Sequence, residues 1–572
     1  MKTSRCFFLL CVILPCVLTG QNLYEERIYE PIVIPGYNMT TLENIPVDEM
    51  YVYSYNEDDQ TWRMIPFQID EKIYGPDSLN PERGRWYYFP PAWWADVDTI
   101  EQKTFDGLYN DHDELVFMIR DMGDKAPEKP WIENDEARNN PRVEIIAYDP
   151  DDEAKKGYVY VYRSKTLKKT GQDVYQMKFD AQLDWVETKY YAIGLGEFGL
   201  IQDIVIKEPG GNGQDIFDTQ KFRFSGVIDA AFPVPLVLTE RSLYRFPQKY
   251  ATENPSVRIV RKVRQTLKIV DLVLEEASFP VTAKFYPFSG TIVGGTSLSP
   301  EDLVDYFGTD IMIILKDLRQ SWDFNSSASG MKFYNAYNDG VVIDGKPDEL
   351  DKTIDIPISE WSLISGDPGS MFVLVNFQET KWKGTELYFW DSQTGSPADS
   401  SIFTVDDTGD NMSYGDFGIL FRNHDQDDIT LDLNFIAYFM PETDLTKEDG
   451  EKLAVQAKNP VKYYSTVLTG VDGSKTSAEP QVFALYQNYP NPFNRSTQIS
   501  FVLPGSRHID LRLYDTQGRL VRVLADGFYT SGKHSIKWDG LDEDNQPVAT
   551  GFYLYRLKTE DFTQTKKLLL IQ

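Results

Sequence analysis

Cysteine is nearly absent from this 572-residue sequence, and where it occurs limits the chemistry of the chain. Cys6, Cys11 and Cys16 are the only cysteines, and all lie in the opening stretch MKTSRCFFLLCVILPCVLTG. Its basic start and short apolar run predict a secretory signal peptide over residues 1–20. Without that peptide the chain has no thiol, which excludes a disulfide framework, a cysteine nucleophile, Cys-bound zinc and an iron–sulfur cluster.

Histidine is almost as scarce. Its four positions are His112, His424, His508 and His534, so an imidazole base or a cluster of histidine ligands has few candidates. The sequence has no G-x-S-x-G motif between a strand and a helix and no phosphate-binding glycine loop. No catalytic constellation is recognisable, but the 88 acidic residues still allow a carboxylate pair that is defined only by its spacing in the fold.

Long apolar runs and an excess of positive charge are also missing. After residue 20 no segment has the roughly 20 uninterrupted apolar residues of a membrane-spanning helix, so we expect no transmembrane segment once the signal is removed. The formal net charge is −31. Such a surface disfavours nucleic acid as a partner and suits solubility, divalent cations or neutral ligands.

Alternating apolar and polar residues dominate the chain from about residue 49 to residue 440. Runs such as MYVYSYN, ELVFMIR, GYVYVYR and MFVLVNF are separated by Gly, Pro, Asn and Asp, the pattern of short β-strands. Helical patterns are rare: one covers residues 297–308, and another runs from Thr446 to Lys458 and ends at Asn459 and Pro460. The sequence therefore predicts a mostly β chain of several sandwiches with few short helices.

Two polar stretches divide this pattern into domains. The proline-bearing segment 125–141 predicts a boundary between an N-terminal β domain, residues 21–135, and a larger β-sandwich body, residues 136–445. The segment TGVDGSKTSAEP follows the second helix, so residues 446–482 are expected to be a helix and a linker. Residues 483–572 then form a separate domain with six short strand patterns, which indicates an Ig-like sandwich.

The last domain carries the most specific motifs. NYPNPFNRSTQISFVLP, LRLYDTQGRLVRVL, GKHSIKWDGLDEDNQPVATGFYLYRL and TKKLLLIQ follow one another, and together they closely resemble the C-terminal sorting domain of type IX secretion cargo. One departure is Arg495, where the family often has a second proline. The residues that carry the resemblance are Pro490, Asn491, Pro492, Phe493, Asn494, Gly518, Trp538, Gly551, Tyr553, Lys566 and Lys567.

The resemblance implies a route and a partner. In that family the domain is read by the type IX outer-membrane translocon after export to the periplasm, and it is commonly cleaved before release or attachment. We therefore expect this protein to be secreted or attached to the outer cell surface. The resemblance says nothing about what the preceding body does.

Two aromatic and polar segments that precede the last domain are candidates for contact with a polysaccharide. GRWYYFPPAWWADVD, residues 84–98, offers flat rings for stacking on sugars, or a plug packed between β domains. LRQSWDFNSSASGMKFYNAYNDG, residues 318–340, has the character of a carbohydrate-facing groove, or of a long irregular loop. The candidate ligand-binding residues are Trp86, Trp93, Trp94, Arg319, Trp322, Asp323, Asn325, Tyr334 and Asn335.

An acidic segment supplies the one candidate cofactor site. Asp106, Asn110, Asp111, Asp113 and Glu114 lie within nine residues, and their oxygens suit calcium. Their spacing is not that of an EF-hand loop, and the alternative is an ordinary solvated turn.

A basic strand pattern stands out in so acidic a chain. SVRIVRKVRQTLKIV, residues 256–270, places Arg258, Lys262, Arg264 and Lys268 on one strand face. Such a face can hold a polyanionic glycan or pair with acidic neighbouring strands.

These observations favour a secreted or cell-surface β protein without enzymatic activity, acting as a glycan-binding or structural surface component. The alternative is a secreted polysaccharide hydrolase or lyase that uses carboxylate chemistry. The sequence nominates no residue pair for that chemistry.

Overall fold

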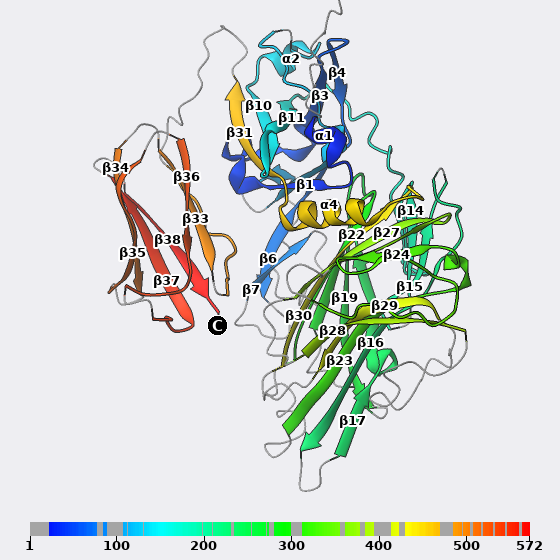
Figure 1. Ribbon diagram of the computed structural model, residues 1–572. Helices are drawn as coiled ribbons and strands as arrows, with labels where there is room; N and C mark the ends of the chain where they lie inside the picture. The colour runs from blue at the N-terminus through cyan, green and yellow to red at the C-terminus, as the bar shows by residue number, and fades with distance from the viewer. Residues whose placement is uncertain are drawn as a thin grey trace, which may run out of the picture.

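The computed structural model of the chain is dominated by antiparallel strands (Figure 1), which confirms the predicted mostly β, multi-domain sandwich class. The structure describes residues 22–76, 84–88, 107–110, 113–129, 131–196, 198–208, 210–229, 234–252, 254–269, 272–273, 279–298, 312–354, 361–377, 384–393, 413–422, 429–468, 484–494, 496–503, 507–515, 519–529, 532–543, 546–559 and 563–571.

The N-terminal unit is a sandwich of two sheets, with strand orders β31-β10-β11-β3-β4 and β1-β9-β5. Its core is formed by apolar residues of both sheets, among them Val52, Leu115 and Val159. The strands are β1 (Pro31–Pro35), β3 (Met50–Asn56), β4 (Thr61–Met64), β5 (Gln68–Asp70), β9 (Glu114–Met118), β10 (Arg142–Asp149), β11 (Asp152–Arg163) and β31 (Lys462–Leu468).

The composition of this unit differs from the domain division that the sequence suggests. β10 and β11 follow the expected boundary at residue 135, yet β11 pairs with β3. β31 follows the whole body and pairs with β10 over seven residue pairs, from Arg142 with Leu468 to Tyr148 with Lys462. The polar segment before β10 is a connection within the unit that buries Trp131, Ile132 and Ala137 against tyrosines of β3 and β11, and the short helix α2 (Asp135–Arg138) lies in it. The chain therefore leaves the N-terminal unit, builds the body and returns.

Smaller elements border this unit. They are α1 (Leu23–Glu26) and the strand pairs β2 (Ile45–Pro46) with β8 (Leu108–Tyr109) and β6 (Lys72–Pro76) with β7 (Gly84–Tyr88).

The body is a larger sandwich. A five-stranded sheet of order β17-β16-β23-β29-β28 faces a ten-stranded sheet of order β18-β19-β21-β22-β30-β27-β26-β24-β25, in which β20 pairs with β19. Trp322 and Phe417 of the smaller sheet and Val373 and Phe435 of the larger one share the core. A four-stranded sheet, β12-β13-β14-β15, adds residues such as Ile193 to that core.

The strands of the five-stranded sheet are β16 (Phe217–Asp229), β17 (Val234–Leu238), β23 (Met312–Phe324), β28 (Gly384–Ser392) and β29 (Ser413–Arg422). Those of the ten-stranded sheet are β18 (Leu243–Ala251), β19 (Ile259–Ile269), β20 (Leu272–Val273), β21 (Phe279–Phe285), β22 (Ser289–Leu298), β24 (Lys332–Asn335), β25 (Asp339–Val342), β26 (Trp361–Gly366), β27 (Gly369–Phe377) and β30 (Ile429–Met440). The four-stranded sheet has β12 (Lys178–Asp180), β13 (Trp185–Glu187), β14 (Tyr191–Leu195) and β15 (Ile201–Ile206).

Helix α4 (Lys447–Lys458) covers the outer face of the ten-stranded sheet and confirms the second predicted helix. The backbone N–H of Thr446 donates to Asp449 Oδ2 at 2.9 Å, which closes its first turn. At its end the Arg27 guanidinium donates to the carbonyl oxygens of Gln456 and Asn459 at 2.6 and 2.7 Å, where helices leave carbonyls without intrahelical partners. The other predicted helix, over residues 297–308, begins at the end of β22, and its residues 299–308 lie outside the described residues.

The C-terminal unit is a sandwich of the sheets β32-β33-β36 and β35-β34-β37-β38, drawn in orange and red in Figure 1. Its six longer strands coincide with the six strand patterns of the sequence. Every residue of its buried core lies between Leu485 and Leu570. The strands are β32 (Ala484–Leu485), β33 (Thr497–Leu503), β34 (Arg507–Asp515), β35 (Leu520–Tyr529), β36 (Gly532–Trp538), β37 (Gly551–Lys558) and β38 (Thr563–Leu570).

The contact between α4 and the sheet predicts the effect of one substitution. Gly450 is buried, and a Cβ at this position would lie 2.3 Å from the ring of Trp361. Gly450→Ala improves helix propensity, but overpacking against Trp361 outweighs this gain, so we expect a net loss of about 1–3 kcal/mol in unfolding free energy. Chemical denaturation measures it. The exposed Glu451→Ala on the same helix is the control and should change stability by less than about 0.5 kcal/mol; a Gly450→Ala protein as stable as wild type would contradict this docking of α4.

Candidate functional site

Several of the residues that carry the resemblance to a sorting domain, which we call the motif residues, lie close to the last strand of the C-terminal sandwich. The segment before β33 runs beside β38, and Phe493 bridges to Leu570. Asn491 Oδ1 accepts a hydrogen bond from the backbone N–H of Leu569 at 2.8 Å, and the Phe493 N–H donates to the Leu569 carbonyl at 3.0 Å. The opening of the domain is thus fastened to its final strand.

Three motif residues build the core beneath this contact. The ring of Trp538 lies 5.4 Å from that of Phe493 and 5.6 Å from that of Tyr553, both in edge-to-face geometry. Trp538 is fully buried, and its indole N–H donates to the Leu541 carbonyl at 2.8 Å. These three residues therefore belong to the buried core of the domain.

Other motif residues remain at the surface. Pro490, Pro492, Asn494 and Lys567 are exposed, and Lys566 is half-buried. The ammonium of Lys567 lies 3.5 Å from the ring centre of Phe552, an exposed aromatic side chain. Gly551 begins β37, and Gly518 lies outside the described residues. The exposed residues are those that a partner can contact.

In the body, the candidate ligand residues Arg319 and Asp323 lie on one face of β23. Side chains alternate along a strand, and Trp322 between them points into the core of the sandwich, so Arg319 and Asp323 point to the other side. Lys221 of β16 pairs with Ser321 of β23, Ser321 with Gly418 of β29, and Gly418 with Tyr388 of β28. We call this surface the polar face; its residues are Lys221, Arg223, Arg319, Ser321, Asp323, Tyr388, Trp390 and Asp416.

A lysine and two carboxylates meet at the centre of the polar face. Lys221 Nζ lies 2.6 Å from Asp323 Oδ2 and 3.7 Å from Asp416 Oδ2. Their residues are 4%, 0% and 1% exposed, respectively, which removes all three groups from water. The Ser413 hydroxyl donates to Asp323 Oδ1 at 2.6 Å. Burial raises the pKa of Asp323 to about 7, and Asp416 acts in the same direction, although Lys221 opposes both.

Charge on the polar face is balanced. The Arg319 guanidinium lies over the ring of Tyr388 at 4.3 Å. Arg319 lies on β23 and Tyr388 on β28, so the Arg319 side chain crosses β29, the strand between them. Gly418 of β29 has no side chain on this face, and a Cβ there would lie 2.0 Å from the Gln320 carbonyl oxygen. Arg223 forms an ion pair with Glu240 at 3.2 Å. Three cationic side chains therefore meet three carboxylates, an arrangement that attracts neither free anions nor free cations.

The remaining candidate ligand residues do not join this cluster. Asn325 accepts a hydrogen bond from the Ser327 N–H at 2.8 Å and begins a short 3₁₀ turn. Tyr334 and Asn335 lie on β24 of the other sheet, where Asn335 Oδ1 accepts from the Asn338 N–H at 2.7 Å. Trp86 lies on β7, and Trp93 and Trp94 lie outside the described residues. Polysaccharide binding by these residues stays a prediction.

The candidate calcium ligands that are described already have protein partners. Asp113 accepts backbone hydrogen bonds from Lys72 at 3.0 Å and Asn110 at 2.8 Å. Glu114 faces Lys72 and Arg258. Within the described residues no group of three or more His, Cys, Asp or Glu side chains is arranged to hold a metal ion. Asp106 and Asp111 lie outside that part of the chain, so calcium binding also stays a prediction.

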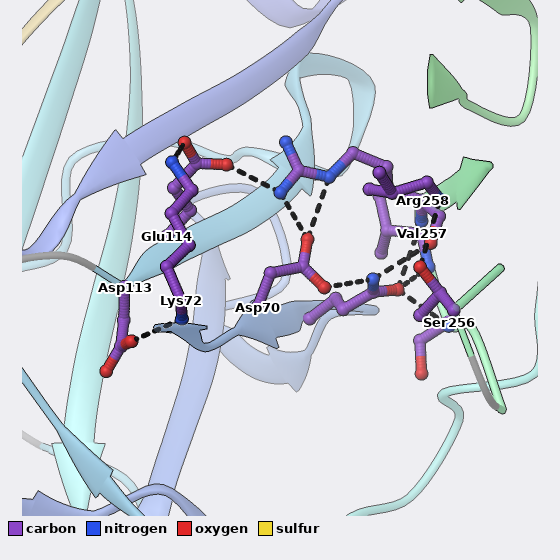
Figure 2. A network of polar contacts seen from close by, with 10 residues as sticks. Asp70, Lys72, Asp113, Glu114, Ser256, Val257 and Arg258 are labelled. Carbon is purple, nitrogen blue, oxygen red and sulfur yellow. Dashed lines mark hydrogen bonds and ion pairs between the residues drawn. The ribbon is translucent and has the colours of Figure 1, made fainter. Parts of the chain in front are cut away.

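Glu114 belongs to a buried network that joins the N-terminal unit to the body (Figure 2). Arg258, just before β19, donates from Nε to Asp70 Oδ2 at 2.8 Å and pairs through Nη2 with Glu114 Oε2 at 2.6 Å. Gln68 Oε1 accepts from three successive backbone N–H groups, those of residues 256–258, at 3.0–3.1 Å. We call Gln68, Asp70, Lys72, Glu114 and Arg258 the junction network. The sequence allowed the basic strand pattern either to hold a polyanionic glycan or to pair with acidic neighbouring strands. Arg258 does the second.

Lys221, Ser413 and Asp416 were missed by reading the sequence alone. Lys221 and Asp416 are charged residues inside apolar strand patterns: Lys221 lies beside Arg223 in TQKFRF, and Asp416 is the one charge in YGDFGILF. A charge at such a position is a usable signal, because it must find a buried partner on a neighbouring strand.

Comparison with known proteins bears on the C-terminal unit. Residues 492–561 match the FlgD Ig-like domain family. The C-terminal sandwich is Ig-like. A search of curated proteins gives no match for the chain.

Among solved structures, latent PorU from Porphyromonas gingivalis has 13% sequence identity and a TM-score of 0.14; the alignment covers 68% of this chain but only 32% of PorU. PorZ, a surface component of the type IX secretion system of the same bacterium, has 10% identity over 67% of this chain and 80% of its own, with a TM-score of 0.13. The Caenorhabditis elegans fusion protein EFF-1 has 7% identity over 92% and 85% of the two chains, with a TM-score of 0.12. TM-scores this low do not establish a shared fold.

No helix in the described residues is long and apolar enough to cross a membrane.

The junction network predicts a pH-dependent stability. Burial opposes ionisation of Glu114, but Arg258, Lys72 and Lys284 outweigh it and lower the pKa of Glu114 to about 2. Because the pKa of Glu in an unfolded chain is about 4.3, the ion pairs stabilise the fold above that pH, and their contribution is lost as the pH falls towards 2. Glu114→Gln should lower the unfolding free energy by about 3 kcal/mol at pH 7, and the difference should shrink below about pH 4.

Denaturation curves over a pH series test this. Glu386→Gln is the matched control, because its 2.6 Å ion pair with Arg422 is about one third exposed; its effect should stay below about 1 kcal/mol. Equal stability of Glu114→Gln and wild type at pH 7 would show that the junction network does not hold the two units together.

Proposed function

We propose that the Ig-like domain, residues 484–571, is an export label for the type IX secretion pathway and that the rest of the mature chain is its passenger. The observation that carries the proposal is the combination of a self-contained core with the sorting motifs. All members of the core come from residues 485–570, so the domain can fold without the passenger. The motif residues divide into those that fasten β38 and those that remain exposed, which gives the translocon a folded surface to bind.

For the passenger, we propose a structural role at the cell surface. Its most polar strand face is buried and charge-balanced, which suits a rigid building unit better than an open sugar-binding groove. A junction of buried ion pairs fixes the first two units to each other. Glycan contacts through Trp86, Trp93 and Trp94 remain compatible with that role.

The enzymatic alternative has less support from the geometry. Asp323 and Asp416 are two carboxylates that lie close together, and both face Lys221. A glycosidase pair must flank the bond of a bound sugar, whereas these two are at most 1% exposed.

Deleting residues 484–572 tests the export label in a bacterium that has the type IX pathway. We expect the truncated protein to accumulate in the periplasm and its amount outside the cell to fall to background. A chain in which an unrelated Ig-like domain replaces residues 484–572 is the matched control, and it should be retained as well. Normal secretion of the truncated protein would contradict the proposal.

A further inference from the structure

The polar face brings an amine and a carboxyl group into contact in surroundings that favour a reaction between them. Lys221 lies on β16 and Asp323 on the neighbouring β23, two residues beyond the register partner of Lys221. Both side chains therefore extend from adjacent strands on the same face. The 2.6 Å between Nζ and Oδ2 places the nitrogen directly against the carboxyl group, and such fixed proximity replaces the entropy cost of bringing two reactants together.

We propose that Lys221 and Asp323 condense to an intramolecular isopeptide bond that covalently joins β16 to β23, with Asp416 transferring the protons. This is a modification site of the passenger and does not depend on how the protein is exported.

The step balances without any co-reactant. The Nζ–Cγ bond forms between Lys221 and Asp323, and the Cγ–Oδ2 bond breaks. Starting from the ammonium and the carboxylate, one hydrogen stays on the new amide nitrogen, and two leave with Oδ2 as water. The products carry no charge, and nothing is oxidised or reduced.

Burial drives the pair towards its reactive form. An ammonium must lose a proton before its nitrogen can attack, and a carboxylate must gain one before oxygen can leave as water. Removal from water makes the neutral amine and the neutral acid more stable relative to the two ions. The raised pKa of Asp323 agrees with this. Burial lowers the pKa of Lys221, but the carboxylates Asp323 and Asp416 outweigh burial and raise this pKa above its usual value. Lys221 therefore becomes a neutral amine only by passing its proton to one of these carboxylates.

Asp416 is placed to move that proton. Its Oδ2 lies 3.7 Å from Lys221 Nζ. Its Oδ1 is buried and makes no hydrogen bond to any residue in the described part of the chain. A buried carboxyl oxygen of this kind can accept a proton from Nζ and deliver it to the leaving Oδ2.

Ser413 decides which oxygen leaves. Its hydroxyl donates to Asp323 Oδ1 at 2.6 Å, and the hydroxyl oxygen in turn accepts from the Asp416 N–H at 3.1 Å. Oδ1 is therefore held in the position of the amide carbonyl, while Oδ2 faces the amine. The product keeps the Ser413 hydrogen bond.

The isopeptide bond would give the chain a covalent cross-link that it cannot form through cysteines. The mature sequence has no cysteine for a disulfide, because Cys6, Cys11 and Cys16 all lie in the predicted signal peptide. A link between residues 221 and 323 closes a loop of about 100 residues and restricts the unfolded chain as a disulfide of that span does.

The mass of the intact, purified protein tests the proposal directly. We expect it to be lower than the mass of its sequence by one water, about 18 Da. After proteolysis we expect a branched peptide in which the segment containing Lys221 is joined to the segment containing Asp323. A wild-type protein at its full sequence mass would overturn the proposal, and this measurement needs no variant to fold.

Two substitutions identify the reacting groups. Lys221→Arg keeps a cation between the two carboxylates but has no amine that can form the amide, so the water should be retained and the branched peptide should vanish. A loss that persists in Lys221→Arg would show that an aspartate has cyclised onto its own backbone, which overturns the proposal. Asp416→Asn leaves the reacting pair in place, and it should slow or abolish the cross-link; an unchanged rate would overturn the role given to Asp416.

Discussion

Arg258 stands where two β-sandwiches meet, and its guanidinium is shared between a carboxylate of β5 and one of β9. A charge buried this deeply is tolerated only when its partners are in place, so the position of the body relative to the N-terminal unit depends on these contacts. Gln68 adds a second constraint, because its side chain binds the backbone on either side of Arg258. Because β31 follows the body and pairs with β10, the N-terminal unit contains chain from both before and after the body.

The Ig-like domain is built on the opposite principle. All the described residues of its core belong to the domain itself, and its first segment is bound to its last strand by Asn491 and Phe493. Such independence suits the role of export label that we propose for this domain. The passenger instead concentrates its buried charge in the junction network and the polar face, two clusters in which each cation has a carboxylate partner or an aromatic ring.

Local sequence patterns predicted the helices and strands better than they predicted which strands pair with each other. The capping residue Thr446 and the stop at Asn459 located α4, and the six alternating runs of the last domain located its strands, because both signals are contained within a few residues. Pairing between β31 and β10 joins residues about 320 apart, and no local pattern encodes it. For the same reason the sequence suggested Arg319, Trp322 and Asp323 together as one surface, although strand alternation sends Trp322 into the core, and it missed Lys221 and Asp416, which reach Asp323 only through the sheet register.

The chain therefore consists of two cooperative bodies: two sandwiches joined by the junction network and by β31, and an Ig-like domain with its own core. Cutting the full-length protein once between residues 468 and 484 and recording the heat capacity of the separated pieces tests this division directly. We predict that each piece unfolds with the same transition that it shows in the intact chain. A single shared transition in the intact chain, or a label that loses its transition after the cut, would contradict the division.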